Sequence, residues 1–268
     1  MTRRRASGKT GKPGGPQRRA GLARGAGPVM LYGRHAVSAA LANPRRRCRR
    51  LRATESAWTA RSSTIELPAN LRPEIVGPDE IQAAAPPGAV AQGLLLEADP
   101  LPSLTIGDVL PPDDYAPCLF VVLDQVEDPH NVGAIMRSAA AFGAAALITQ
   151  DRHSPQESGV LARSASGALD ILPWVRAPNL ARALAQMAER NIWRIGLDGV
   201  AYEALGRTLP GERLALVLGA EGSGLRPLTR AHCDLLAHIP MQPLSPLIDS
   251  LNVSNAAAVA LYALVCRI

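Results

Sequence analysis

The chain has 268 residues, of which 47% are hydrophobic and 3% aromatic, and its formal net charge is +6. No apolar run approaches the roughly 20 residues that span a bilayer, and no apolar stretch follows the basic N-terminus as in a secretory signal. The four cysteines are scattered without a CxxC pair, which argues against a metal site or a disulfide framework and favours a reducing cytoplasm. We therefore expect a cytoplasmic protein that neither enters a membrane nor binds a metal.

The first 27 residues carry eight basic side chains and no acidic one, so the rest of the chain is slightly acidic despite the overall charge of +6. This segment is rich in Gly, Pro, Arg and Lys and cannot bury enough apolar surface to offset the entropy of ordering. We predict a disordered basic tail over residues 1–27. Such a tail is either an arm that binds nucleic acid or a solubilising leader.

Residues 28–98 are expected to form a small α/β domain, here called the front domain. The pattern predicts strands at Met30–Tyr32 and Gln92–Glu97 and a short helix at His35–Ala42, which ends before the proline that follows Asn43. Five prolines fall within residues 99–117, so this stretch reads as an interdomain linker.

A cluster of arginines follows the first predicted helix, with six in the eight residues from 45 to 52. Arginine neutralises phosphate charge and forms paired hydrogen bonds with it. We predict contact with RNA phosphates, and a solvated strand or loop edge is the alternative interpretation. The residues assigned to RNA binding are Arg45, Arg46, Arg47, Arg49 and Arg50.

Residues 118–268 alternate short apolar runs with helical patterns, which predicts an α/β unit with a mainly parallel sheet covered on both faces. The predicted strands are Leu119–Leu123, Ala145–Thr149, Ile171–Trp174, Ile192–Leu197, Leu214–Leu218 and Leu235–Ile239. The predicted helices are Val132–Phe142, Leu180–Glu189, Thr229–His232 and Val253–Val265.

Polar residues gather where several of these strands end. Asn131 and Arg137 follow the first strand, and three glycines surround Glu221 after the strand Leu214–Leu218. Singly, they read equally well as a helix cap, an exposed arginine and an ordinary turn. The glycine spacing matches neither a dinucleotide-binding G-x-G-x-x-G motif nor a P-loop.

Together, three ordered motifs resemble those of the SpoU branch of the SPOUT RNA methyltransferases. They are N-x-G-x-x-x-R at 131–137, G-A-E-G-x-G at 219–224 with I-P at 239–240, and S-L-N-V-S-N-A at 250–256. The front domain also resembles that family's substrate-binding domain, through Y-G-x-H-A-V at 32–37 and Q-G-L at 92–94. The similarity is greatest to enzymes that methylate guanosine 2′-hydroxyls in 23S rRNA.

The resemblance implies a trefoil-knotted α/β methyltransferase domain over residues 118–268, a homodimer, and S-adenosylmethionine bound in the knot without a metal. Segment 242–249 departs from the family pattern because it is longer than the usual linker, so we expect the loop over the cofactor to differ. The cofactor contacts that the resemblance implies are Leu218, Gly219, Ala220, Ile239, Met241, Ser250 and Leu251.

The catalytic set implied by the resemblance consists of Asn131, Arg137, Glu221, Asn252 and Ser254. Arg137 would stabilise charge or position a phosphate, because a guanidinium does not lose its proton in proteins. Glu221 would orient Arg137, the two asparagines would hold the ribose or a phosphate, and Ser254 would support them. Methylation of tRNA, and a non-catalytic role in RNA binding or ribosome assembly on the same fold, are the alternatives.

Overall fold

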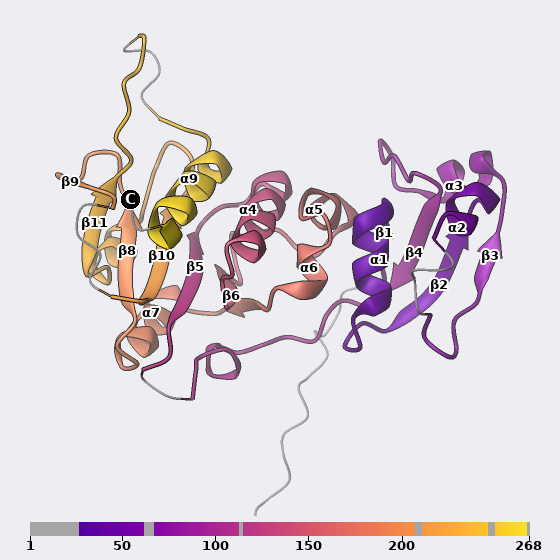
Figure 1. The fold of residues 1–268 in the computed structure, drawn as a ribbon, viewed down its shortest axis with the longest axis horizontal. Helices are drawn as coiled ribbons and strands as arrows, with labels where there is room; N and C mark the ends of the chain where they lie inside the picture. Colours follow the sequence, from indigo (N-terminus) through magenta and orange to yellow (C-terminus); the bar gives the residue numbers. More distant parts are fainter. Residues whose placement is uncertain (1–26, 62–66, 113–114, 207–210, 246–249, 267–268) are drawn as a thin grey trace, which may run out of the picture.

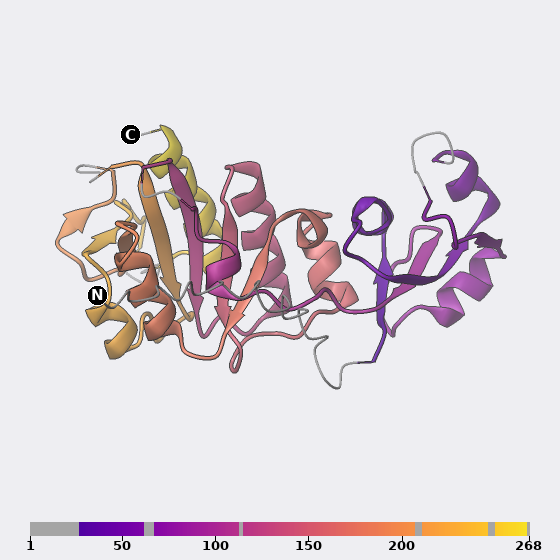
Figure 2. The ribbon, with the colours of Figure 1, turned by 90° about the horizontal axis from the view of Figure 1, so that it is seen from below.

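The computed structural model describes residues 27–61, 67–112, 115–206, 211–245 and 250–266. It contains two β-sheets at opposite ends of an elongated molecule, with helices between them (Figure 1). Figure 2 shows the same arrangement from below. Except for Gly27, the predicted basic tail lies outside the described residues.

The first sheet has four strands in the order β1-β4-β2-β3, and its central strands β4 and β2 pair in antiparallel fashion. The predicted strand at Met30–Tyr32 and the predicted helix at His35–Ala42 are confirmed, and the second half of the arginine-rich segment, from Cys48, lies in strand β2. The elements are β1 Val29–Tyr32, α1 Arg34–Ala42, β2 Cys48–Ala53, α2 Glu55–Thr59, β3 Pro73–Ile75, α3 Pro78–Ala84 and β4 Leu94–Ala98.

The second sheet has seven strands in the order β7-β6-β5-β10-β8-β11-β9, and all its strand pairs are parallel, which confirms the predicted sheet type. Its strands are β5 Cys118–Asp124, β6 Ala146–Gln150, β7 Trp174–Ala177, β8 Trp193–Leu197, β9 Glu203–Ala204, β10 Arg213–Gly219 and β11 Leu235–His238. The helices are η1 (3-10) Ile106–Asp108, α4 Pro129–Ala141, α5 Gly159–Ser164, α6 Ala168–Ile171, α7 Leu180–Ala188, α8 Pro227–Ala231 and α9 Val253–Cys266.

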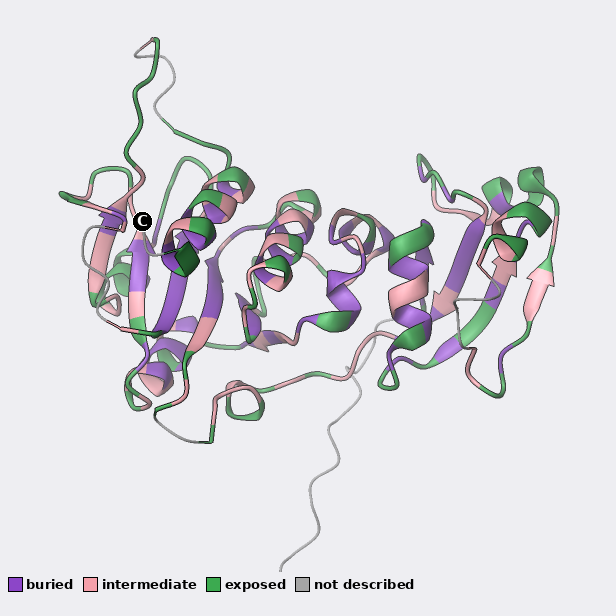
Figure 3. Cartoon of the chain, in the orientation of Figure 1, coloured by how far each residue is buried: buried purple, intermediate pink, exposed green. Residues whose placement is uncertain are grey.

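Apolar side chains cover both faces of the second sheet, so its central strands β5 and β10 are buried over most of their length (Figure 3). Along β5, Phe120 and Val122 pack into a cluster with helix α7, whereas Val121 and Leu123 pack into a cluster with α4 and α9. This alternation follows from the period of two in a strand. Burial on both faces explains why the strands read as continuous apolar runs.

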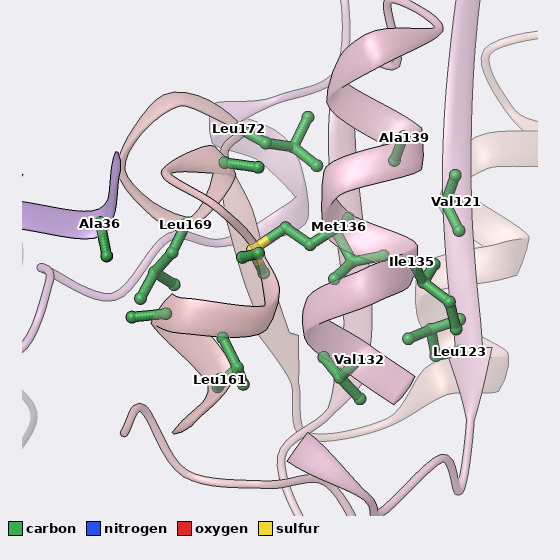
Figure 4. Close-up of a cluster of buried hydrophobic side chains, with 14 of the residues drawn as sticks. Ala36, Val121, Leu123, Val132, Ile135, Met136, Ala139, Leu161, Leu169 and Leu172 are labelled. Atoms are coloured by element: carbon green, nitrogen blue, oxygen red, sulfur yellow. The ribbon is translucent and has the colours of Figure 1, made fainter. Parts of the chain in front are cut away.

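The cluster on the α4 side continues into the first sheet. Figure 4 shows Ala36 of α1 beside Leu169 of α6, with Met136 of α4 reaching toward the same group. The two sheets therefore share one apolar core through helices α1, α5 and α6.

One sequence-based expectation needs correction. The segment Ile171–Trp174 is not a strand, because α6 ends at Ile171 and β7 begins at Trp174. A short apolar run is compatible with either a helix end or a strand. Pro173 cannot donate a backbone hydrogen bond, so it fits inside neither element and separates the two. Within the predicted linker, Leu104 pairs with β7 and Ile106 packs on the core near α7.

Within the described residues, no helix is long and apolar enough to cross a membrane. Over the same part of the chain, His, Cys, Asp and Glu side chains do not gather in groups of three or more that could hold a metal ion.

Candidate functional site

A cavity of about 800 Å³ opens at the carboxyl ends of β8, β10 and β11. In parallel α/β sheets, ligands bind outside the carboxyl ends of the strands, near the point where the strand order reverses. Here the chain moves outward from β5 through β6 and β7 and returns on the other side as β8. The lining comes from residues 197–199, 218–222, 224, 237–241, 243, 250–253 and 256.

All seven predicted cofactor contacts line this cavity. Leu218, Gly219 and Ala220 belong to the end of β10 and the loop after it, and Ile239 and Met241 follow β11. Ser250 and Leu251 precede helix α9 on the other side. Segments separated by about 30 residues in the sequence thus meet around one space.

The glycine-rich loop after β10 folds tightly back on itself. Ala220 and Gly224 form an isolated β-bridge, and the Gly224 N–H donates to the Ala220 carbonyl oxygen at 2.9 Å. A Cβ added to Gly219 would lie 2.1 Å from the Gly224 carbonyl carbon. The loop therefore requires glycine at 219 for close backbone approach.

Asp124 at the end of β5 anchors the far end of this loop. Its carboxylate is fully buried and accepts hydrogen bonds from the Arg226 backbone N–H at 3.1 Å and Nε at 2.7 Å. Sequence reasoning missed this pair. The sequence did contain a signal for it, because Asp124 ends a run of apolar residues. A carboxylate buried at such a position needs a partner.

Four of the five predicted catalytic residues form one hydrogen-bonded group at the mouth of the cavity. Glu221 Oε1 accepts from Asn252 Nδ2 at 2.6 Å, from Asn131 Nδ2 at 3.2 Å and from the Val253 N–H at 3.3 Å. Asn252 Nδ2 also donates to Asn131 Oδ1 at 3.0 Å. Asn252 Oδ1 accepts from the Ser254 hydroxyl at 2.6 Å and from its N–H at 2.9 Å, which caps the start of α9.

Arg137 is not bonded to this group: the Glu221 carboxylate contacts Asn131, Asn252 and Val253, and in the part of the chain that the structure describes no contact is present through which Glu221 would orient Arg137. It is exposed, and among the described residues its side chain has no hydrogen-bond or ion-pair partner. Six residues along α4 place it about 9 Å farther along the helix than Asn131 and on a different face. Gly133, between them, is needed for packing, because a Cβ there would lie 2.6 Å from the Leu161 carbonyl oxygen.

The predicted RNA-binding arginines have different environments. Arg45 and Arg47 are exposed, although Arg47 Nε lies 3.7 Å from Asp99 Oδ2. Arg49 also donates to Asp99, and Arg50 donates to Glu74 at the surface. The Arg50 hydrogen bonds lower the pKa of the Glu74 carboxyl.

Arg46 is buried, and its assignment to RNA contact is wrong. Its guanidinium bonds with Asp170 and Glu157. Burial opposes its charge, yet hydrogen bonding and attraction from these carboxylates outweigh burial and raise the pKa of Arg46. An arginine inside a surface-like cluster can thus be a core residue when acids from distant segments meet it.

Asp198 is a cavity residue that the motifs did not reveal. Its Oδ2 lies 2.6 Å from Arg230 Nη1, and its Oδ1 accepts from the Val200 N–H at 3.1 Å. It follows β8 directly, so the same rule of polar residues at strand ends pointed to it.

A family model described as the SpoU rRNA Methylase family matches residues 118–262. A 23S rRNA (guanosine-2′-O-)-methyltransferase of Pasteurella multocida, RlmB, is 41% identical over 181 residues, covering 66% of this chain and 72% of that protein. The enzyme of the same name from Pseudomonas putida is 35% identical over 236 residues, covering 87% of this chain and 94% of that protein.

The fold is also similar to a crystal structure of the SpoU methyltransferase AviRb from Streptomyces viridochromogenes in complex with the cofactor AdoMet. The TM-score is 0.72 at 24% identity, over 90% of each chain. This likeness confirms the predicted α/β fold class, whereas the knot stays a prediction.

Proposed function

Because the chain belongs to the SpoU rRNA methylase family, we propose that it transfers a methyl group from S-adenosylmethionine to the ribose 2′-hydroxyl of a guanosine in 23S rRNA. The relatives with this activity include one that aligns with most of the chain. One structural observation carries the proposal: the second and third motif segments line a single cavity, and Asn131 of the first motif hydrogen-bonds with Glu221 and Asn252 of that lining.

The cavity suits a ligand of this size, since sites for drug-sized molecules and cofactors measure roughly 300–1,000 Å³ and this one about 800 Å³. Leu218, Ile239 and Leu251 offer apolar surface, while the tight turn at Gly219 exposes backbone groups. S-adenosylmethionine, when bound there, supplies an electrophilic methyl group.

The hydrogen-bonded group at the mouth orients two amides toward a substrate. Glu221 accepts from both asparagines, which fixes the direction of each amide, and Ser254 holds the Asn252 oxygen. Asn131 keeps one amide N–H and one oxygen lone pair for a ribose or a phosphate, whereas the Asn252 amide makes four hydrogen bonds within the group and exchanges one of them to contact the substrate. We assign Asn131 and Asn252 to holding the ribose in line for transfer, which raises the rate through orientation.

Arg137 acts, in this proposal, on the RNA and not through Glu221. Its exposed guanidinium can stabilise negative charge or bind a phosphate, although it cannot accept the hydroxyl proton. Arg137→Ala should abolish methyl transfer and leave the Kd for S-adenosylmethionine unchanged. Arg182→Ala, at an exposed arginine on α7, is the matched control, and equal activity of the two variants would refute the assignment.

RNA capture is assigned to the front domain, residues 28–98, through the exposed Arg45 and Arg47, and to the basic tail. The protein is proposed to act in the cytoplasm as a homodimer, supported by the exposed apolar side chains on α9 at Val259, Tyr262 and Val265. Removing residues 1–27 should weaken RNA binding and flatten its dependence on salt, because fewer counterions are released.

The deciding experiment measures transfer of labelled methyl from S-adenosylmethionine to unmodified 23S rRNA and to bulk tRNA, with nucleoside analysis. Label in 2′-O-methylguanosine of the rRNA is the expected result. Label only in tRNA would overturn the proposed substrate and support the proposed methyl-transfer reaction. No label in either RNA, together with no binding of S-adenosylmethionine, would overturn the enzymatic proposal.

A further inference from the structure

The junction between the two sheets contains a buried ionic network centred on Arg46. The Arg46 side chain has no exposed surface, and Nε and Nη2 donate to the two Asp170 carboxylate oxygens at 2.8 and 3.1 Å. Nη1 donates to the Asp99 carbonyl oxygen at 3.0 Å and to Glu157. All three guanidinium nitrogens are therefore engaged in a fixed plane.

Every carboxylate oxygen of the two acidic partners accepts at least one hydrogen bond. Asn43 Nδ2 donates to Asp170 Oδ1 at 3.1 Å, and the Leu101 N–H donates to Glu157 Oε2 at 3.0 Å. The side chains of Asp170 and Glu157 retain only 1% and 9% of their exposure. Because a paired buried network tolerates little displacement of either partner, it specifies geometry more than net stability.

The network joins parts of the chain that are more than 100 residues apart. Asn43 and Arg46 belong to the loop between α1 and β2, whereas Asp170 lies in α6 and Glu157 just before α5. Asp99 and Leu101 come from the segment that follows β4. The first sheet, the connecting segment and the second unit are thus held at one point.

Close backbone packing surrounds this point. A Cβ on Gly159 would lie 2.3 Å from the Met30 carbonyl oxygen and 2.4 Å from the Tyr32 ring. On a second contact, Arg163 Nη1 donates to the Val90 carbonyl oxygen at 2.9 Å. The junction therefore has no slack between α5 and β1, and the shared core in Figure 4 continues through it.

The loop held by Arg46 also carries the exposed arginines. Arg45 and Arg47 flank it in sequence, and both are exposed while Arg46 is buried. The loop backbone that carries these two side chains is consequently anchored by the same buried residue.

We propose that Arg46 is a positioning residue: its network with Asp170 and Glu157 holds the RNA-binding surface of the front domain in one register with the methyl-transfer cavity. The inference rests on the proposed function, because it assigns the register to the presentation of a ribose to Asn131 and Asn252. An Arg46 variant should lose the correct presentation of long RNA while its cavity stays intact.

The test compares Arg46→Lys with Arg213→Lys. Lysine keeps the charge but cannot form the planar, paired contacts of arginine. Arg213 is a second buried arginine, which donates to the Arg190 carbonyl oxygen at 2.9 Å within the second unit, away from the junction. Each full-length variant is measured for rRNA KM, kcat, the Kd for S-adenosylmethionine and the X-ray scattering profile in solution.

We expect Arg46→Lys to raise the rRNA KM or lower kcat by about 10- to 100-fold, as displacements near 1 Å do, with an unchanged Kd for S-adenosylmethionine. Its scattering profile should show a larger radius of gyration, and Arg213→Lys should show neither effect. Wild-type kinetics and scattering in folded Arg46→Lys would overturn the proposal, as would equal kinetic losses in the two variants. If Arg46→Lys does not fold, the near-isosteric Asp170→Asn replaces it.

Failure of the proposed function is recognised separately. If the wild-type protein transfers no methyl group to rRNA, that function fails, and the scattering comparison alone decides whether Arg46 holds the two units together. An unchanged radius of gyration in Arg46→Lys would then refute the proposal that Arg46 holds the two units together.

Discussion

Substitution of Gly219 by alanine tests whether the tight loop after β10 builds the cofactor cavity. The new Cβ would lie 2.1 Å from the Gly224 carbonyl carbon, 2.2 Å from its oxygen and 2.4 Å from the Leu225 nitrogen. All three contacts are with backbone, so no side-chain rotation can relieve them. The bridge between Ala220 and Gly224 must open, and the cavity wall must move.

Overpacking of this kind costs about 1–3 kcal/mol, and about 1.4 kcal/mol corresponds to a tenfold change in affinity. If the strain falls on the bound state, the Kd for S-adenosylmethionine should rise by roughly 5- to 150-fold. Calorimetric titration measures this Kd, and thermal unfolding shows how much of the strain is borne by the free protein.

Gly199→Ala is the control, because Gly199 lines the same cavity and an added Cβ meets nothing within 4 Å. It should bind S-adenosylmethionine far better than Gly219→Ala. Wild-type affinity together with a wild-type Tm in Gly219→Ala would refute the reasoning.

Three further predictions concern stability and reactivity. Gly133→Ala places a Cβ 2.6 Å from the Leu161 carbonyl oxygen. The clash should lower the free energy of unfolding by about 1–3 kcal/mol, and the higher helix propensity of alanine should return about 1 kcal/mol of this. A urea midpoint above that of the wild type would contradict the prediction. Burial opposes the charge of Asp234, but Arg194 outweighs it and lowers the pKa of Asp234 below 3.8. Asp234→Asn should therefore lower the free energy of unfolding by its full amount near neutral pH, and this difference from the wild type should shrink as the pH falls through the folded-state pKa. A difference that grows in acid would contradict the lowered pKa. Burial raises the pKa of the Cys233 thiol to about 12, so at pH 8 a disulfide reagent should label it only after unfolding; rapid labelling of the native protein would show the thiol to be accessible.

The family and the fold class were predictable because their signals are local. Strands such as β5 and β10 are continuous apolar runs that end in polar loops, and the period of the pattern is visible within a few residues. The three ordered motifs added the cofactor contacts, which line one cavity.

The catalytic group could be predicted only as a set of residues. Asn131, Glu221 and Asn252 are each a plausible cap or turn residue, and contacts across 90 and 121 residues bring them together. The same motifs suggested that Arg137 would join them, and helix geometry separates it.

Arg46 shows most clearly what the tertiary structure decided. In the sequence it is one of six arginines in eight residues, and its neighbours Arg45 and Arg47 are indeed exposed. Its burial depends on Asp170, 124 residues away, because a buried guanidinium needs partners for its charge and its N–H groups, and here a distant carboxylate supplies them. The sequence by itself determined which segments become strands and helices and which family they belong to, since those properties depend on neighbouring residues. Only the packing of the two sheets decided which charged side chains meet inside the protein and which remain free to meet RNA.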